Sequence, residues 1–316
     1  MDTTFLPLIG SEIALSLYPQ LIKLIPTTIE NQVATRCITY SILAILGYYI
    51  TQQNNTNITS NTNIVSFTKT SIIMGIVNIT HIISSYMCYN TLTSGVGYSI
   101  FYMYPIFNLL GRTFIYKEKI DIVNYIYILI SILGVYLIYK NNTNLEHTPE
   151  PNLESFINVN DILNTKNRTI GVVAGIVSAL TESIIYFMVK DTSLSVSPFI
   201  QLLKTYLLGG IVSVIYFIQK LTINTPTNTP TNTTTHLDYH YWITLILFNA
   251  IIGFVGYLLR FIMIPRLSTL LFNSLIFTGV IFAYIWGYIL SNEPITYNNV
   301  SGTLLIVMSI FLINKK

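Results

Sequence analysis

The segment "SNEPITYNNVSGTLLIVMSIFLI" at residues 291–313 places a short polar turn directly before a long apolar run. The segment "YKEKIDIVNYIYILISILGVYLI" at residues 116–138 has the same arrangement. Each turn carries one glutamate, Glu118 in the earlier segment and Glu293 in the later one, which are 175 positions apart (293 − 118). The same shift aligns residues 98–140 with 273–315 without a gap and pairs further identical residues, so each glutamate is predicted to mark the same turn in two copies of one unit.

The composition indicates that lipid surrounds most of the chain. Of its 316 residues, 52% are hydrophobic and only 9% are charged, whereas an ordinary soluble domain has about 25% charged residues. The mean hydropathy is +0.59. The net charge of +3 is spread over short loops, so no basic face for nucleic acid is expected. Both cysteines, Cys37 and Cys88, fall within apolar runs, where a thiol usually behaves as a small buried hydrophobe.

Ten apolar runs are long enough to be membrane spans, since about 20 residues cross the hydrocarbon core as a helix. The runs are continuous rather than alternating, which favours helices over a membrane β-barrel. The fold class is therefore predicted to be all-α integral membrane, with ten transmembrane helices. The spans are expected near residues 5–25, 32–50, 70–90, 94–115, 121–139, 169–189, 198–218, 241–262, 268–290 and 297–313.

The domain organisation follows from two polar inserts rich in Asn, Thr and Pro. We expect a first five-helix repeat at residues 5–140, a polar linker loop at 141–168 and a second repeat at 169–316 that contains a disordered loop at 221–240. Five is an odd number, so the second repeat must enter the membrane from the opposite side. The Lys and Arg distribution favours a multi-pass protein with both termini in the cytoplasm.

A family resemblance lies in the two segments that end the repeats. They read "YMYPIFNLLGRTFIYKEKIDIVNYIYILISILGVYLIY" and "LIFTGVIFAYIWGYILSNEPITYNNVSGTLLIVMSIFLI". The chain resembles the drug/metabolite transporter superfamily of the EamA-like kind, most clearly over residues 71–140 and 243–313, although Val280 stands where the first half has Pro105. The resemblance implies a ten-helix carrier that moves a small polar or amphipathic metabolite by alternating access.

Ionisable residues within the spans are expected to be paired or functional, because a charge in the membrane is costly. Glu182 and Lys204 lie at similar depth on neighbouring spans, so an ion pair between them is predicted, with a substrate or proton site as the alternative. Glu12 lies about 10 Å into the first span and has no evident basic neighbour, which makes it the first candidate for proton coupling. The alternative for Glu12 is a hydrogen bond to a Ser or Tyr on a neighbouring helix.

Other polar side chains form a second group of candidate solute contacts. Transporter sites gather such groups near the midplane between repeats, although many tyrosines simply belt the membrane interfaces. A lone His81 is more typical of hydrogen-bonded packing, and without further His or Cys at ligand spacing no metal and no cofactor is expected. Besides Glu12, Glu182 and Lys204, the substrate or coupling candidates are His81, Tyr98, Tyr102, Asn108, Tyr257 and Asn273.

The leading functional hypothesis is a general metabolite transporter. A nucleotide-sugar or sugar-phosphate exchanger would need several basic groups in its cavity. The only candidates are Lys204, Arg260 and Arg112, and the two arginines are expected close to the inner interface. A non-transporting membrane receptor or lipid-handling protein is the other alternative. No protease motif is present, so no enzyme is expected. The expected partners are a small-molecule solute and the lipid bilayer, with a homodimer left open and no nucleic acid.

Overall fold

The described part of the chain contains helices and no strand. The computed structural model describes residues 5–54, 69–117, 121–141, 159–190, 196–223 and 239–314. The first half contains α1 (Leu6–Leu15), α2 (Tyr18–Leu24), α3 (Ile29–Asn54), α4 (Lys69–Thr91), α5 (Ser94–Phe101), α6 (Tyr104–Tyr116) and α7 (Ile122–Asn141). The second half contains α8 (Val159–Lys190), α9 (Pro198–Ile223), α10 (Tyr239–Leu247), the π-helix η1 (Phe248–Phe254), α11 (Val255–Met263), α12 (Thr269–Leu275), α13 (Phe277–Ser291) and α14 (Tyr297–Asn314).

Six helices in the described ranges are long and apolar enough to cross a membrane, fewer than the ten predicted. They are Ile29–Gln53, Lys69–Thr91, Asn167–Lys190, Pro198–Lys220, Tyr239–Met263 and Leu271–Ser291, and Ile122–Ile138 is a shorter apolar helix. The predicted spans at 5–25 and 94–115 are each divided into two helices. In both, the second helix begins at a Tyr-Pro pair, with Pro19 or Pro105 in its first turn. Proline lacks an N–H and cannot continue the preceding helix, which explains both breaks.

The polar inserts differ from the prediction at their edges. α8 begins at Val159, so part of the predicted linker loop at 141–168 is helical. The Asn-rich stretch of the other predicted loop, and Glu118 in the first glutamate turn, lie outside the described residues.

Helix boundaries in the two halves repeat with the same separation of 175 residues that aligns the sequence. The helices α5 and α12 begin at residues 94 and 269, α6 and α13 end at 116 and 291, and α7 and α14 begin at 122 and 297. Two non-glycine residues in the described part have a positive φ, Lys117 at 55° and Asn292 at 49°. They also differ by 175 (292 − 117), so one backbone turn follows the fourth unit of each half.

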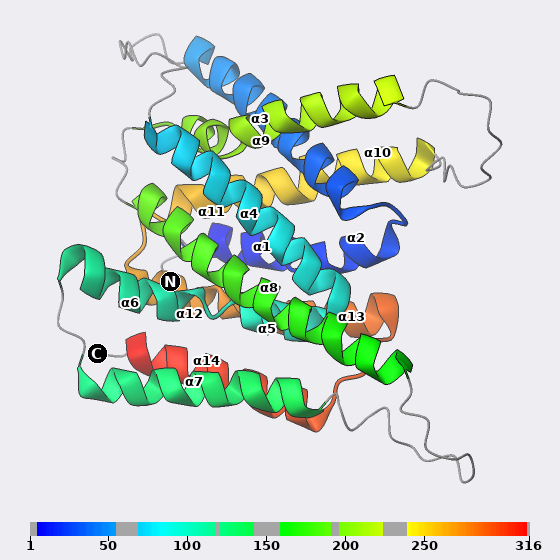
Figure 1. Cartoon of the computed structure of the whole chain (residues 1–316). Helices are drawn as coiled ribbons and strands as arrows, with labels where there is room; N and C mark the ends of the chain where they lie inside the picture. The colour runs from blue at the N-terminus through cyan, green and yellow to red at the C-terminus, as the bar shows by residue number, and fades with distance from the viewer. Residues whose placement is uncertain are drawn as a thin grey trace.

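The helices pack in reciprocal pairs across the two halves. α3 packs on α9 and α7 packs on α14, while α4 on α8 is matched by α1 on α11. The pair α7 and α14 runs antiparallel, since Gly134 faces Ile306 where Gly302 faces Ile138. At the crossing, each of these two glycines lies against the backbone carbonyl of the other. Figure 1 shows α7 and α14 side by side, with the start of α1 and the end of α14 at the same end of the bundle.

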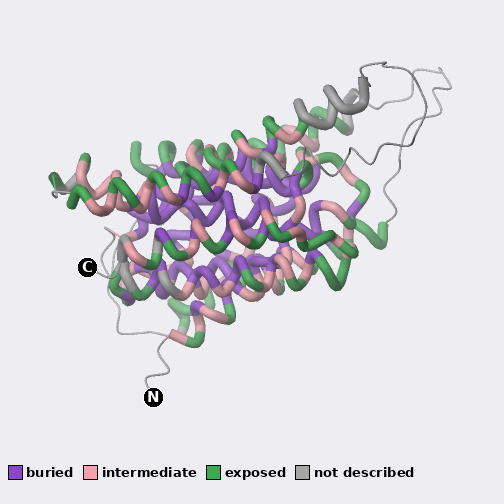
Figure 2. Tube along the Cα trace, turned by 90° about the horizontal axis from the view of Figure 1, so that it is seen from below, coloured by how far each residue is buried: buried purple, intermediate pink, exposed green. Residues whose placement is uncertain are grey.

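Apolar side chains cover the outside as well as the centre. Figure 2 shows buried residues along the middle of the bundle and exposed ones around it. Many of the exposed residues are large and apolar, for example Ile42 and Leu46 on α3 and Leu304 and Phe311 on α14. Such a surface suits lipid rather than water, and together with the apolar helices it makes this an integral, multi-pass membrane protein.

Candidate functional site

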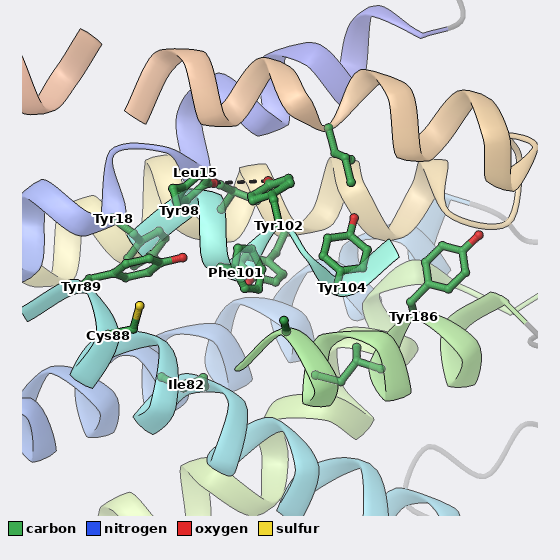
Figure 3. Packing of buried hydrophobic residues seen from close by; sticks show 14 of the residues in the cluster. Leu15, Tyr18, Ile82, Cys88, Tyr89, Tyr98, Phe101, Tyr102, Tyr104 and Tyr186 are labelled. Atoms are coloured by element: carbon green, nitrogen blue, oxygen red, sulfur yellow. Dashed lines mark hydrogen bonds between the residues drawn. The ribbon is translucent and has the colours of Figure 1, made fainter. Parts of the chain in front are cut away.

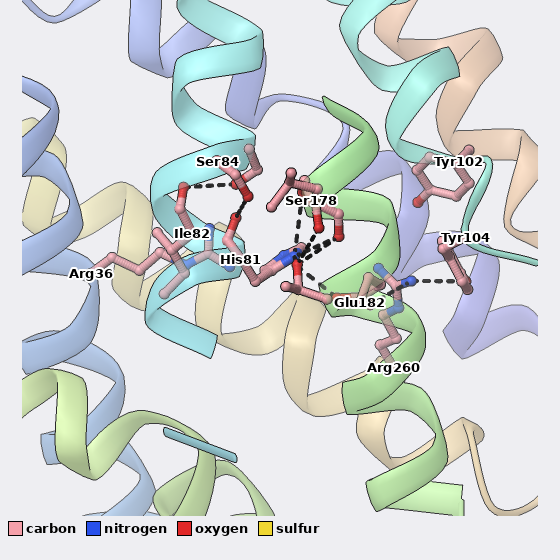
Figure 4. A network of polar contacts seen from close by, with 12 residues as sticks. Arg36, His81, Ile82, Ser84, Tyr102, Tyr104, Ser178, Glu182 and Arg260 are labelled. Carbon is pink, nitrogen blue, oxygen red and sulfur yellow. Dashed lines mark hydrogen bonds and ion pairs between the residues drawn. The ribbon is translucent and has the colours of Figure 1, made fainter. Parts of the chain in front are cut away.

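A buried arginine forms the centre of the candidate site. Arg260 on α11 has 1% of its side chain exposed. Its Nη2 lies 2.9 Å from Oε1 of Glu182 on α8, and its Nε lies 3.8 Å from Oε1 of Glu12 on α1. One guanidinium therefore pairs with two buried carboxylates that come from opposite halves of the chain, and Figure 4 shows its contact with Glu182.

His81 on α4 extends this group of charges. Its Nε2 lies 3.5 Å from Oε2 of Glu182, and its Nδ1 lies 3.2 Å from the carbonyl oxygen of Ser178 (Figure 4). A proton on Nδ1 of His81 lets that nitrogen donate to the carbonyl oxygen of Ser178. The contact between Nε2 of His81 and Oε2 of Glu182 is then favourable only if one of these two atoms also carries a proton. Histidine and glutamate can therefore share a proton at this contact.

Two tyrosines on either side of the break between α5 and α6 complete the surroundings of the charges. Tyr102 directly follows α5, and its hydroxyl donates to Oε2 of Glu12. Tyr104 begins α6, and its hydroxyl accepts a hydrogen bond of 2.9 Å from Nη2 of Arg260. The break caused by Pro105 thus aims both hydroxyls at the buried charges, and Figure 3 shows them beside Tyr98 and Phe101.

Arg260 and His81 also line a small cavity between the halves. The free space is about 20 Å³, which is room for about one water molecule. Basic and aromatic side chains dominate the wall, and among the described residues no group of three or more His, Cys, Asp or Glu is arranged to hold a metal ion. The lining residues are Leu15, Tyr18, Arg36, His81, Ser85, Tyr89, Tyr98, Phe101, Tyr257 and Arg260.

Two lysines make contacts at helix ends outside the cavity wall. At one end, Nζ of Lys23 lies 2.5 Å from Oε1 of Glu293, whose Oε2 accepts 2.7 Å from the backbone N–H of Ser94. This contact joins α2, the start of α5 and the turn before α14. At the other end, Nζ of Lys190 donates to the carbonyl oxygens of Ile264 and Leu267, at 3.0 and 2.7 Å. Each lysine contact therefore ties a helix end to a neighbouring part of the bundle.

The structure brings together six of the nine predicted site residues. Glu12, Glu182 and Tyr102 contact the charged group directly, and the cavity wall includes the other three, His81, Tyr98 and Tyr257.

The remaining three predicted site residues lie elsewhere. Asn108 on α6 accepts 2.7 Å from the hydroxyl of Ser183. Asn273 is buried on α12, and Lys204 is half-buried on α9, with neither in the cavity wall.

Two predictions about charge were wrong. Glu182 pairs with Arg260 and not with Lys204, because α8 packs on α4 while α9 packs on α3, so the two side chains do not face each other. Arg260 was expected close to the inner interface, yet it is buried, at 1% exposure, and pairs with two carboxylates. Glu12 also has the basic neighbour that the sequence did not reveal.

Sequence reasoning missed the surroundings of Arg36. Tyr18, Tyr40 and Tyr206 surround its guanidinium, and Asn249 in η1 accepts 2.8 Å from the hydroxyl of Tyr18. The available signal was an arginine within a predicted span, which is rare enough to be a site candidate in itself. A π-helix is likewise frequent at functional sites.

Comparisons with known proteins agree with the fold. Residues 169–315 match the family model described as the EamA-like transporter family. No curated protein sequence matches the chain. A solved crystal structure matches with a TM-score of 0.58 at 11% identity, over 98% of this chain and 96% of the other. At that identity the likeness concerns the fold alone, but it extends across both halves.

Proposed function

Because the chain belongs to the EamA-like transporter family, within the drug/metabolite transporter superfamily, we propose that it moves a small polar or amphipathic metabolite across its membrane by alternating access. The observation that carries this proposal is the cavity between the halves, where Arg260 pairs with Glu12 from one half and Glu182 from the other. A buried charged group is costly in a membrane and is retained where it handles a solute or an ion.

The proposed architecture is a pair of inverted five-helix repeats. Its support is the common separation of 175 residues in helix starts and ends, together with the antiparallel pair α7 and α14. The reciprocal packing of helices from the two halves also supports it, because a two-fold relation requires each contact to recur with the roles exchanged. Alternating access would then rock one half against the other around the cavity. Both termini are proposed to be cytoplasmic, which follows the positive-inside rule.

The lysine contacts are proposed to be the two gates. Opening toward one side would separate Lys23 from Glu293, and opening toward the other would release Lys190 from the end of α11. Lys23 lies in the last turn of α2, and Lys190 is the last residue of α8. The position of each lysine near the end of the first unit of its half supports a mechanism in which the two ends open in turn.

Proton coupling at Glu12 is the proposed driving mechanism. Glu12 is fully buried and shares Arg260 with Glu182, so a proton on either carboxyl changes the charge that Arg260 must balance.

A second candidate function is exchange of phosphate-bearing solutes. It is favoured by one specific observation, the two arginines in the cavity wall, which meets the requirement for basic groups.

Solute flux in reconstituted liposomes tests the proposal. We expect counterflow of a bound solute, pH-dependent in the unmodified protein and independent of pH in Glu12→Gln. Unchanged pH dependence in Glu12→Gln would reject coupling at Glu12. If solute binds yet no flux occurs in either direction, the chain is a receptor or lipid-handling protein and the transport proposal fails.

A further inference from the structure

Arg36 on α3 lies within a cage of five tyrosine rings. Its Cζ lies 4.6 Å from the ring centroid of Tyr18 and 4.7 Å from that of Tyr257, with three more rings at 5.3 to 5.9 Å. The rings come from α2, α3, α4, α9 and α11, and so from both halves. They are Tyr18, Tyr40, Tyr86, Tyr206 and Tyr257.

The cage holds the cation without neutralising it. Within the part of the chain that the structure describes, no carboxylate lies within ion-pair distance of Arg36. An aromatic face attracts a cation through its quadrupole, so five rings lower the cost of burial, but they carry no net negative charge. Arg36 therefore keeps a full positive charge at 2% exposure, a condition that proteins rarely maintain without an anion.

Donors in the cage also remain available. Nη2 of Arg36 donates to the hydroxyl of Tyr206 at 3.1 Å, whereas its buried Nε–H has no acceptor among the described residues. The hydroxyl of Tyr86, 0% exposed, likewise has no hydrogen-bond partner there. Leaving buried donors unsatisfied is unfavourable, and both would be satisfied by an acceptor that enters between the rings.

The cavity connects this cage to the rest of the site. Arg36, Tyr18 and Tyr257 line it together with Tyr89 and Tyr98, whose rings stack at 5.9 Å. The wall thus offers an uncompensated cation at one side and flat aromatic surfaces at the other. Arg260 adds no free positive charge, since it is already paired with two carboxylates.

We propose that Arg36 is the subsite for the oxyanion group of an organic anion, carboxylate or phosphate. The free space of about 20 Å³ is too small for such an anion, so the anion enters when the two halves move apart, and its planar apolar body then contacts the neighbouring tyrosine rings. The inference rests on the proposed transport function and names its substrate class. Guanidinium is suited to such groups because its donors match two oxygens at once. The bound anion neutralises Arg36, so the loaded cavity carries no net charge at this subsite when the halves rock across the membrane.

Binding to the purified unmodified protein tests the charge preference first. Four small probes share one ring and differ in charge: benzoate, phenyl phosphate, neutral benzamide and cationic benzylamine. We expect at least one of the two anions to raise the melting temperature and to bind measurably by calorimetry, and the amide and the amine to do neither. If neither anion binds at millimolar concentration, or if benzylamine binds as tightly as the anions, the assignment is wrong.

Variants then test the residue. Arg36→Lys keeps the charge but loses the planar fork, and we expect it to weaken binding of the preferred anion roughly 10-fold, with Arg36→Gln weakening it roughly 100-fold. Lys220→Gln, which removes a positive charge outside the cavity wall, is the matched control and should bind as the unmodified protein does. Unchanged anion affinity in Arg36→Gln overturns the proposal even if that variant melts at a lower temperature. The probe comparison needs no variant, so it decides the matter if the variants do not fold.

The same probes separate this inference from the transport proposal. Anion binding without flux in liposomes would keep the subsite and reject transport. Flux of neutral or cationic solutes, with no anion binding, would keep transport and reject the subsite.

Discussion

Two arginines lie buried in this bundle, and they are balanced in opposite ways. Arg260 has the carboxylates of Glu12 and Glu182 at 3.8 and 2.9 Å, whereas Arg36 has five tyrosine rings and no carboxylate in the described residues. The difference teaches that burial alone does not assign a role to a charge. A charge that is paired with carboxylates within the protein does not require a charged solute as a partner. A charge that is surrounded only by aromatic rings can still bind an anionic solute.

The largest effect is expected from removing the balanced arginine. Arg260→Met leaves two carboxylates buried without a cation, and we expect it to lower the free energy of unfolding by about 3–5 kcal/mol. Arg36→Met leaves only rings behind, so its loss should stay below about 2 kcal/mol. Denaturation of both purified variants in detergent at neutral pH makes the comparison. Equal losses would mean that the two sites do not differ as described.

Removing one of the two carboxylates that pair with Arg260 should lower the free energy of unfolding by less than removing Arg260 itself. Glu182→Gln keeps the size of the side chain but removes the charge 2.9 Å from Arg260, and we expect a loss of about 2 kcal/mol. A double-mutant cycle with Arg260→Gln isolates the pair. A coupling energy near zero would show that Glu12 alone balances Arg260.

The comparison also explains how far the sequence could predict this site. Glu12, His81 and Glu182 were identified because an ionisable side chain within an apolar span is costly wherever it points. The 175-residue shift located the turn at Lys117 and Asn292 because local backbone geometry follows local sequence. The partners of these side chains could not be predicted in the same way. The sequence gives the depth of a residue along its helix, but it does not show which neighbouring helix the side chain faces.

The buried arginines illustrate that limit. Arg260 lies close to the end of α11, which predicted an interfacial position, but the following Ile264 and Leu267 are themselves buried and the helix ends inside the protein. Arg36 lies near the start of α3, and the rings that surround it come from helices as distant in sequence as α2 and α11. No local pattern connects those tyrosines.

A glycine tests whether the cage of Arg36 depends on close packing. A Cβ at Gly253 in η1 would overlap the hydroxyls of Tyr18 and Tyr40, which hydrogen-bond each other at 2.6 Å. Gly253→Ala should therefore lower the free energy of unfolding by about 1–3 kcal/mol. The matched control is Gly10→Ala on α1, where nothing lies within 4 Å of the new Cβ. The control should be neutral or stabilising, because alanine is the better helix former.

The smallest effect separates the rings of the cage from their hydroxyl groups. Tyr206→Phe removes the hydroxyl that accepts 3.1 Å from Nη2 of Arg36 but keeps the ring at 5.9 Å from Cζ. We expect a loss of about 1 kcal/mol, and a further loss of about 1 kcal/mol in Tyr206→Leu, where the ring is absent as well. Should Tyr206→Phe account for the whole effect of Tyr206→Leu, hydrogen bonding rather than the quadrupole would hold Arg36, and the contrast with Arg260 would be one of geometry instead of charge balance.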